Sequence, residues 1–256
     1  MTGRGDVPDV TNAPVGMASL DLEPPDRVLA VGAHPDDIEF GCGATLAKWV
    51  DAGATVHLLV LTDGSKGTWD LDADLRALVE RRREETERAA IRLGAVAVHT
   101  LGWPDGELGS GLVEREAVCR VIREVRPDVL LGHDPWRRYR LHPDHRHAGW
   151  LTVDGLVAAR DPHFFPAAGS HHRVRQLLLF EADEPDHLES VGATFDRKVA
   201  ALLEHRSQWR TTLGIDPTDP NGPDRLAARL LEEASAVAAR YGHPGPAEAF
   251  RRISGD

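Results

Sequence analysis

Apolar runs of strand length alternate with amphipathic segments of helix length along most of the chain. Runs such as RVLAVGA and ATVHLLVLT are apolar at nearly every position, which indicates strands buried on both faces. The segments between them are longer and carry charge on one face, as helices do. The predicted strands cover 27–33, 54–62, 95–101, 126–134 and 173–182, and the predicted helices cover 43–53, 74–94, 113–125, 195–206 and 224–241, with another helix beginning near Pro143.

The alternation of buried strands and helices predicts an α/β fold. The expected architecture is a Rossmann-like, doubly wound, mostly parallel sheet with helices on both faces. Residues 1–25 are rich in glycine, proline and aspartate and are predicted to form a flexible N-terminal arm. Residues 26–256 are predicted to form one domain, in which 209–256 make a helical C-terminal extension. Ligands of such sheets bind beyond the carboxyl ends of the strands, so residues directly after a strand are the first candidates for a site.

Charge and cysteine content narrow the class of protein. The 256 residues carry a formal net charge of -11, which argues against nucleic acid or an anionic membrane as a partner. The sequence shows no signal peptide and no apolar run of transmembrane length, so membrane insertion is not expected. Two cysteines, Cys42 and Cys119, do not suffice for a disulfide framework, and a cytoplasmic location is expected. The expected partner is a small molecule, and a homo-oligomer is compatible with the sequence.

The first chemistry-bearing motif is His34-Pro35-Asp36-Asp37, directly after the first predicted strand. Two adjacent carboxylates are costly at the end of an apolar run, because like charges repel and burial penalises the charged form. On a tight turn that enters a helix, His34 and Asp37 can point to one position, with Asp36 close by. The alternative interpretation is a surface turn whose aspartates cap the following helix.

The second motif is RLHPDHRHAG, residues 140–149, after the fourth predicted strand. Pro143 suits the first position of a helix, and His142 and His145, three residues apart, can share one side of it. The alternative interpretation is a polar, histidine-rich helix start. Both motifs follow strands, so both are expected at the same edge of the sheet.

Together the two motifs favour a catalytic metal site. His34, Asp37 and one histidine of the pair His142 and His145 would supply three protein ligands and leave open positions, as catalytic sites do. Zinc is the expected ion, and iron(II) is an alternative for two histidines and one carboxylate. Asp36, close to the ion but not bound to it, is then the natural general base for water. The remaining histidine would stabilise an oxyanion or protonate a leaving amine.

These motifs resemble those of the LmbE-like, or PIG-L, deacetylases, a family that includes N-acetylglucosaminyl-phosphatidylinositol deacetylases and the deacetylases of mycothiol and bacillithiol synthesis. The resemblance spans roughly Arg27 to Gln208. It implies a single LmbE-like catalytic domain and a zinc-dependent N-deacetylase of an N-acetylated amino sugar or its glycoside. It rests on HPDD at 34–37, HPDH at 142–145, TDG at 62–64, RREETERAAIRLG at 82–94 and PDG at 104–106.

The resemblance also implies roles for individual residues of the two motifs. His34, Asp37 and His145 are implied as the metal ligands. Asp36 is implied as the general base, and His142 as the residue that assists the tetrahedral intermediate.

Further residues are implied outside the metal-ligand positions. Arg82, Asp105 and Tyr139 are implied as substrate contacts. The segment YRLHPDH has one residue more than the common YGHPDH spacing, so Tyr139 stands one residue farther from the second motif than the resemblance implies. His133 and Asp134 follow the fourth predicted strand and are interpreted as support for the ligands.

Two other functions are compatible with the motifs. Members of the same family include an amidase of mycothiol conjugates and a hydratase of an unsaturated tricarboxylate. A hydratase would need arginines near the metal to bind carboxylates, and Arg137, Arg138, Arg140 and Arg146 are candidates. The other interpretation is a non-catalytic metal- or sugar-binding module, against which the extra carboxylate of Asp36 argues.

Overall fold

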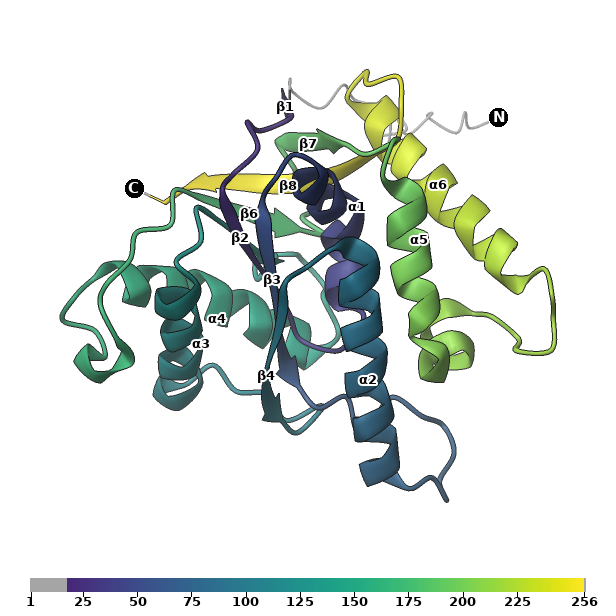
Figure 1. Ribbon diagram of the computed structural model, residues 1–256, viewed down its shortest axis with the longest axis horizontal. Helices are drawn as coiled ribbons and strands as arrows, with labels where there is room; N and C mark the ends of the chain where they lie inside the picture. Colours follow the sequence, from purple (N-terminus) through teal and green to yellow (C-terminus); the bar gives the residue numbers. More distant parts are fainter. Residues whose placement is uncertain (1–17, 256) are drawn as a thin grey trace, which may run out of the picture.

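The computed structural model describes residues 18–255, which form a layered α/β fold around one sheet of eight strands (Figure 1). The strand order is β1-β7-β8-β6-β5-β2-β3-β4, and β8 is antiparallel to both of its neighbours while the other pairs are parallel. The predicted doubly wound, mostly parallel fold is therefore confirmed. The strands are β1 (Ser19–Leu20), β2 (Arg27–Gly32), β3 (Thr55–Thr62), β4 (Ala97–Trp103), β5 (Val129–His133), β6 (Gln176–Phe180), β7 (His187–Ser190) and β8 (Ala247–Ser254).

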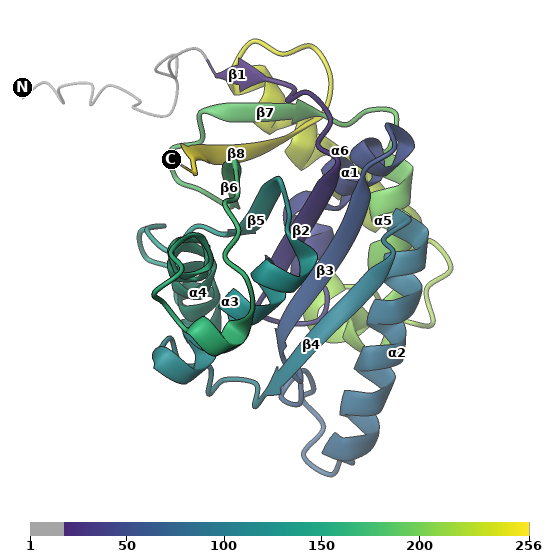
Figure 2. The ribbon, with the colours of Figure 1, turned by 60° about the vertical axis from the view of Figure 1, so that its left-hand side comes forward.

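Helices cover both faces of this sheet (Figure 2). Leu29 and Val31 of β2 pack toward α3 and α4, whereas Val28 and Ala30 pack toward α1, α2 and α5. Burying one such leucine or valine side chain stabilises the fold by about 1.5–3 kcal/mol, so a strand buried on both faces must be apolar throughout. The helices are α1 (Asp37–Asp51), α2 (Leu75–Leu93), α3 (Leu112–Val125), α4 (Pro143–Arg160), α5 (Phe195–Glu204) and α6 (Gly222–Arg240), with short turns at Pro166–Ala168, Arg206–Gln208 and Trp209–Leu213.

The sheet has its switch point between β2 and β5. From β2 the chain adds β3 and β4 on one side, and β5 and β6 follow on the other. The connections after β2 and β5 therefore leave toward opposite faces and open a crevice at the carboxyl edge. The first motif follows β2, and the second motif follows the loop after β5.

Helix α1 is interrupted just after the first motif. Cys42 has non-helical dihedral angles (φ -152°, ψ 15°), so the helix restarts there. Glu248 of β8 accepts hydrogen bonds from the restarted amides, at 3.2 Å from Ala44 N and 2.8 Å from Thr45 N. Lys198 of α5 donates to Glu248 at 2.6 Å. A buried ion pair from β8 and α5 thus caps the second half of α1, where a helix start needs acceptors.

The two ends of the described chain differ from the sequence-based expectation. Of the predicted arm, 1–17 lies outside the described residues, but Ser19–Leu20 pairs in parallel with β7 and is part of the sheet. The predicted C-terminal extension is helical only in part, because Ala247–Ser254 forms β8 between β6 and β7. The segment AEAFRRIS carries two consecutive arginines, of which Arg251 is exposed, and has no continuous apolar run, so its strand pattern is weak.

Within residues 18–255, none of the helices combines the length and the hydropathy that a membrane crossing needs.

Candidate metal centre and active site

The first motif forms a tight, strained turn between β2 and α1. Asp36 has φ 102°, in the left-handed region, and Asp37 is the first residue of the helix. The carboxylate of Asp37 accepts a hydrogen bond of 2.7 Å from the backbone N of His34, which closes the turn. A Cβ at Gly32 would lie 2.9 Å from Ile38, so only glycine fits there. A non-glycine residue in the left-handed conformation, such as Asp36, costs about 1–3 kcal/mol, and backbone strain of this kind concentrates at functional sites.

The second motif begins helix α4. His142 is the N-cap and Pro143 the first helical residue, as predicted. Asp144 follows, fully buried, and His145 faces the first motif.

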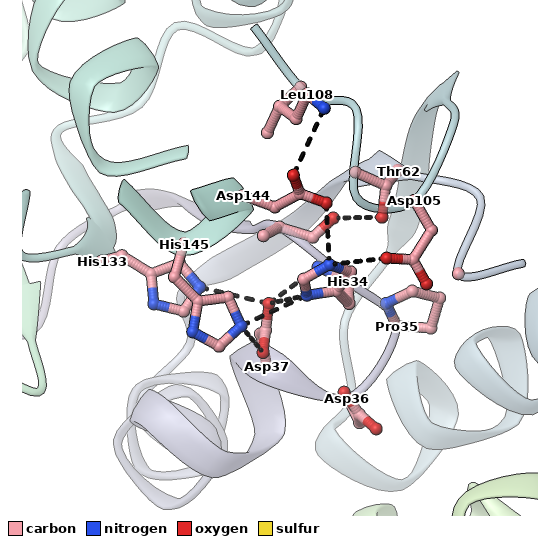
Figure 3. Close-up of polar contacts among 12 residues, drawn as sticks. His34, Pro35, Asp36, Asp37, Thr62, Asp105, Leu108, His133, Asp144 and His145 are labelled. Atoms are coloured by element: carbon pink, nitrogen blue, oxygen red, sulfur yellow. Dashed lines mark hydrogen bonds and ion pairs between the residues drawn. The ribbon is translucent and has the colours of Figure 1, made fainter. Parts of the chain in front are cut away.

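The donor atoms of His34, Asp37 and His145 converge (Figure 3). His145 Nε2 lies 3.2 Å from His34 Nδ1 and 3.2 Å from Asp37 Oδ1. His34 Nδ1 lies 3.3 Å from Asp37 Oδ2. Ligand atoms held 2.0–2.1 Å from a tetrahedral zinc ion are about 3.3 Å apart, so these separations are those of a metal-binding face.

The other nitrogen of His34 is held by carboxylates. His34 Nε2 lies 3.1 Å from Asp144 Oδ2 and 3.2 Å from Asp105 Oδ1. Burial lowers the pKa of His34, but the bonds to Asp105, Asp144 and Asp37 outweigh burial and raise it to about 12. The carboxylates thus favour a positive charge at the His34 ring. The two of them near Nε2 would keep a proton on that nitrogen, which leaves Nδ1 to bind a metal. Both features fit a resident cation.

Asp144 is itself anchored by the loop after β4. Its carboxylate accepts hydrogen bonds from Gly106 N at 2.6 Å and from Leu108 N at 3.3 Å. The sequence pattern predicts no role for Asp144, although this residue stands inside the second motif. Its role depends on its burial against His34, and that burial arises from tertiary structure, which the local sequence does not reveal.

His133 is the other residue whose contacts the sequence did not specify. It ends β5, and its Nε2 lies 3.2 Å from Asp37 Oδ2 while its Nδ1 lies 3.0 Å from Glu181 Oε2. Burial lowers the pKa of His133, but the two carboxylates raise it above its usual value. Arg140 donates to the same Glu181 oxygen at 2.7 Å. With Asp37 and His145, His133 also forms a second group of atoms close enough to share an ion.

Asp36 points away from the converging ligands (Figure 3). It is buried, and Arg82 Nη2 lies 3.4 Å from its Oδ2. Burial raises the pKa of Asp36 to about 6, against the opposing charges of Arg82 and His205. His205 is fully buried and lies 3.5 Å from Glu39 Oε1.

Arg82 lies beneath the strained turn. It is only 3% exposed and donates to Pro35 O at 2.7 Å and to Gly64 O at 2.8 Å. Together with its contact to Asp36, these bonds hold the turn in place. The implied contact of Arg82 with substrate stays a prediction, since the guanidinium faces the turn and not the crevice.

Asp105, Tyr139 and His142 occupy three different positions. Asp105 is buried against His34, as described above, and its implied contact with substrate stays a prediction. Tyr139 is 93% exposed on the loop before α4 and lines, with His142, a surface hollow of about 410 Å³. The ring of His142 lies 4.6 Å from that of His34 and 4.8 Å from that of His145. Burial lowers the pKa of His142, and the charges of the other two histidines lower it further.

Comparisons with known proteins find relatives along most of the chain. The family profile of the GlcNAc-PI de-N-acetylases, PIG-L, matches residues 29–155. The diacetylchitobiose deacetylase of Thermococcus kodakarensis is 36% identical over 187 residues, which cover 72% of this chain and 70% of the relative. A 1D-myo-inositol 2-acetamido-2-deoxy-alpha-D-glucopyranoside deacetylase of Thermomonospora curvata is 34% identical over 240 residues, covering 84% of this chain and 77% of the relative.

A solved structure extends the likeness to the whole fold. The N,N'-diacetylchitobiose deacetylase of Pyrococcus horikoshii, crystallised with an inhibitor, superposes with a TM-score of 0.80 at 27% identity. The match covers 90% of this chain and 85% of that one. With both motifs, the fold and these relatives in agreement, the chain belongs to the PIG-L, or LmbE-like, deacetylase family.

Proposed function

We propose that this protein is a metal-dependent N-deacetylase of an N-acetylated amino sugar or its glycoside. Zinc is the proposed metal, with iron(II) as the alternative. The observation that carries the proposal is the convergence of His34 Nδ1, Asp37 and His145 Nε2 within 3.2–3.3 Å at the switch point, next to a carboxylate that takes no part in it. The relatives named above act, by their names, on acetylated amino sugars.

The proposed roles of the side chains are those that the family resemblance implies. A bound zinc ion would polarise the amide carbonyl and make a water molecule more acidic. Asp36, which lines the same cavity as Asp37 and His145, is the proposed acceptor of the proton of the attacking water. His142 lies beside His34 and His145, where its imidazole donates a hydrogen bond to the developing oxyanion, and the proton that Asp36 took from water passes to the leaving amine. The products are acetate and the free amino sugar.

The geometry does not favour hydratase chemistry. The arginines that would have to bind substrate carboxylates already have partners: Arg137 and Arg140 pair with Glu181 at 3.5 and 2.7 Å, and Arg138 pairs with Asp183 at 3.6 Å. Arg146 donates to two backbone carbonyl oxygens.

Acetate release tests the proposal directly. The purified chain, stripped with a chelator and reloaded with zinc or iron(II), should release acetate from N-acetylglucosaminides, and the stripped protein should not. Asp36→Asn should lower turnover about 10²–10⁴-fold, the usual contribution of a general base, while its metal content stays that of the wild type. Asp51→Asn, at the exposed end of the same helix, is the matched control. Absence of acetate release with either metal, or full turnover of Asp36→Asn, would refute the proposal.

A further inference from the structure

A cavity of about 580 Å³ extends from the candidate site toward helix α6. Asp37, His133 and His145 line one end of it. At the other end its wall is formed by α6, through Ala234 and Val237. Figure 1 shows α6 beside α5, with its C-terminal end next to β7 and β8. We call this space the α6 cavity.

The wall that α6 gives to the α6 cavity is largely apolar. Phe40 of α1 and Leu230, Ala234 and Val237 of α6 are buried or half-buried there, and Tyr241 adds a ring. The buried ion pair of Lys198 and Glu248 also lines the cavity, and the charged residues that are exposed form its rim. An apolar wall combined with a few polar groups is the usual composition of a small-molecule site.

The size of the α6 cavity exceeds what the reacting group needs. Pockets that hold drug-sized ligands measure about 300–1,000 Å³, and this one falls in the middle of that range. An acetyl group occupies only a small part of such a volume. The remaining space, with its apolar wall, matches a further substituent of the substrate.

The wall belongs to the part of the chain outside the family profile. The profile matches residues 29–155, which contain Asp37 and His145, whereas α6 follows from residue 222. Elements around a shared site are where specificity resides in folds of this kind. The apolar wall lies in such an element, outside the segment that the family profile matches.

From these observations, and resting on the deacetylase function proposed above, we propose that the substrate carries an apolar substituent that occupies the α6 cavity while its acylated amine lies at His145 and Asp37. The substituent is either a longer acyl chain on the amine or an apolar aglycone on the sugar. Both present the same chemistry to Phe40, Ala234 and Val237.

Activity on paired substrates tests this proposal and separates its two forms. Relative to methyl N-acetylglucosaminide, kcat/KM should rise at least about tenfold for either the hexyl N-acetylglucosaminide or the methyl N-hexanoylglucosaminide, since one methylene in an apolar pocket changes specificity by about tenfold or more. Ala234→Trp, which fills the cavity, should abolish that advantage. Ala236→Trp, on the exposed side of the same helix, is the matched control and should keep it.

A binding measurement makes the proposal independent of turnover. Hexyl glucoside, which has no amide, should bind the zinc-loaded wild type and Ala236→Trp in calorimetry, and Ala234→Trp should bind it at least about tenfold more weakly. If hexyl glucoside binds as expected and no acylated sugar is cleaved, the deacetylase function fails and the cavity assignment stands. If acetate is released but neither hexyl compound is preferred, or if both tryptophan variants behave alike, the cavity assignment is wrong.

Discussion

Replacing Glu248 by leucine should unfold the second half of α1 and strongly destabilise the protein. The Glu248 side chain is 5% exposed and accepts bonds from Lys198, Ala44 N and Thr45 N. Its removal leaves the ammonium of Lys198, 8% exposed, without its charged partner and two helix amides without an acceptor. Breaking a buried ion pair on one side costs about 3–5 kcal/mol. In a domain of this size, each kcal/mol lowers Tm by about 2–4 °C.

Urea unfolding followed by circular dichroism measures this loss. The matched control is Glu107→Leu, because Glu107 pairs with Lys66 at 3.0 Å while both side chains are more than half exposed, and such pairs contribute about 0–1 kcal/mol. A double-mutant cycle with Lys198→Met should give a coupling energy of about 1 kcal/mol or more. A loss below about 1 kcal/mol for Glu248→Leu, equal to that of the control, would refute the capping role of β8.

Three further predictions follow from contacts near the site and at the sheet edge. Asp144→Asn should weaken zinc binding about 10–100-fold, measured by competition with a chelating dye, because it removes a charged partner of a ligand histidine; unchanged affinity would count against that role. Arg82→Lys should lower kcat by about 10²-fold at unchanged metal content, since lysine cannot make all three bonds that hold Asp36 and its turn; a loss of metal instead would show a structural role. Burial raises the pKa of Asp21, but its bonds, first that from Lys48, outweigh burial and leave the pKa below the usual value. The stabilisation from Asp21 should thus be complete above about pH 4 and disappear as the pH falls through the lowered pKa, and the stability difference between wild type and Asp21→Asn, followed from pH 6 to 3, checks this.

Removal of the metal has its own expected signature. Chelation should lower Tm and zinc should restore it, because a ligand present at a thousand times its Kd stabilises the folded state by about 4 kcal/mol. The same Tm with and without zinc would show that the converging ligands do not hold an ion.

The sequence pattern predicts best those strands that are buried on both faces of the sheet. Strands β2, β3 and β5 are apolar at most positions because both faces are covered, and that pattern is local. β1 and β7 are too short for any pattern, and β8 mixes Phe250 with Arg251 and Arg252. The predicted helix from 43 coincides with the restart of α1 after Cys42, while its first turn, 37–41, was not predicted.

The site residues that stand in short contiguous motifs could be predicted from the sequence. His34, Asp37 and His145 stand in two short motifs that each follow a strand, and the structure brings them together. The partners that orient them, Asp144 and His133, were harder to assign, because their contacts cross more than ninety residues of sequence. The implied substrate contacts of Asp105 and Arg82 stay predictions, and both side chains are buried.

The bond between Glu248 and Ala44 has a consequence for the order in which the protein folds. The two residues are 204 positions apart, although Ala44 is only seven residues beyond Asp37. During synthesis the first motif emerges early, but the helix that carries it cannot be capped until β8 has emerged and entered the sheet. Contacts of such long range form late and slow the folding of a domain. The helix that follows the first motif should therefore reach its final form only after β8 has been synthesised.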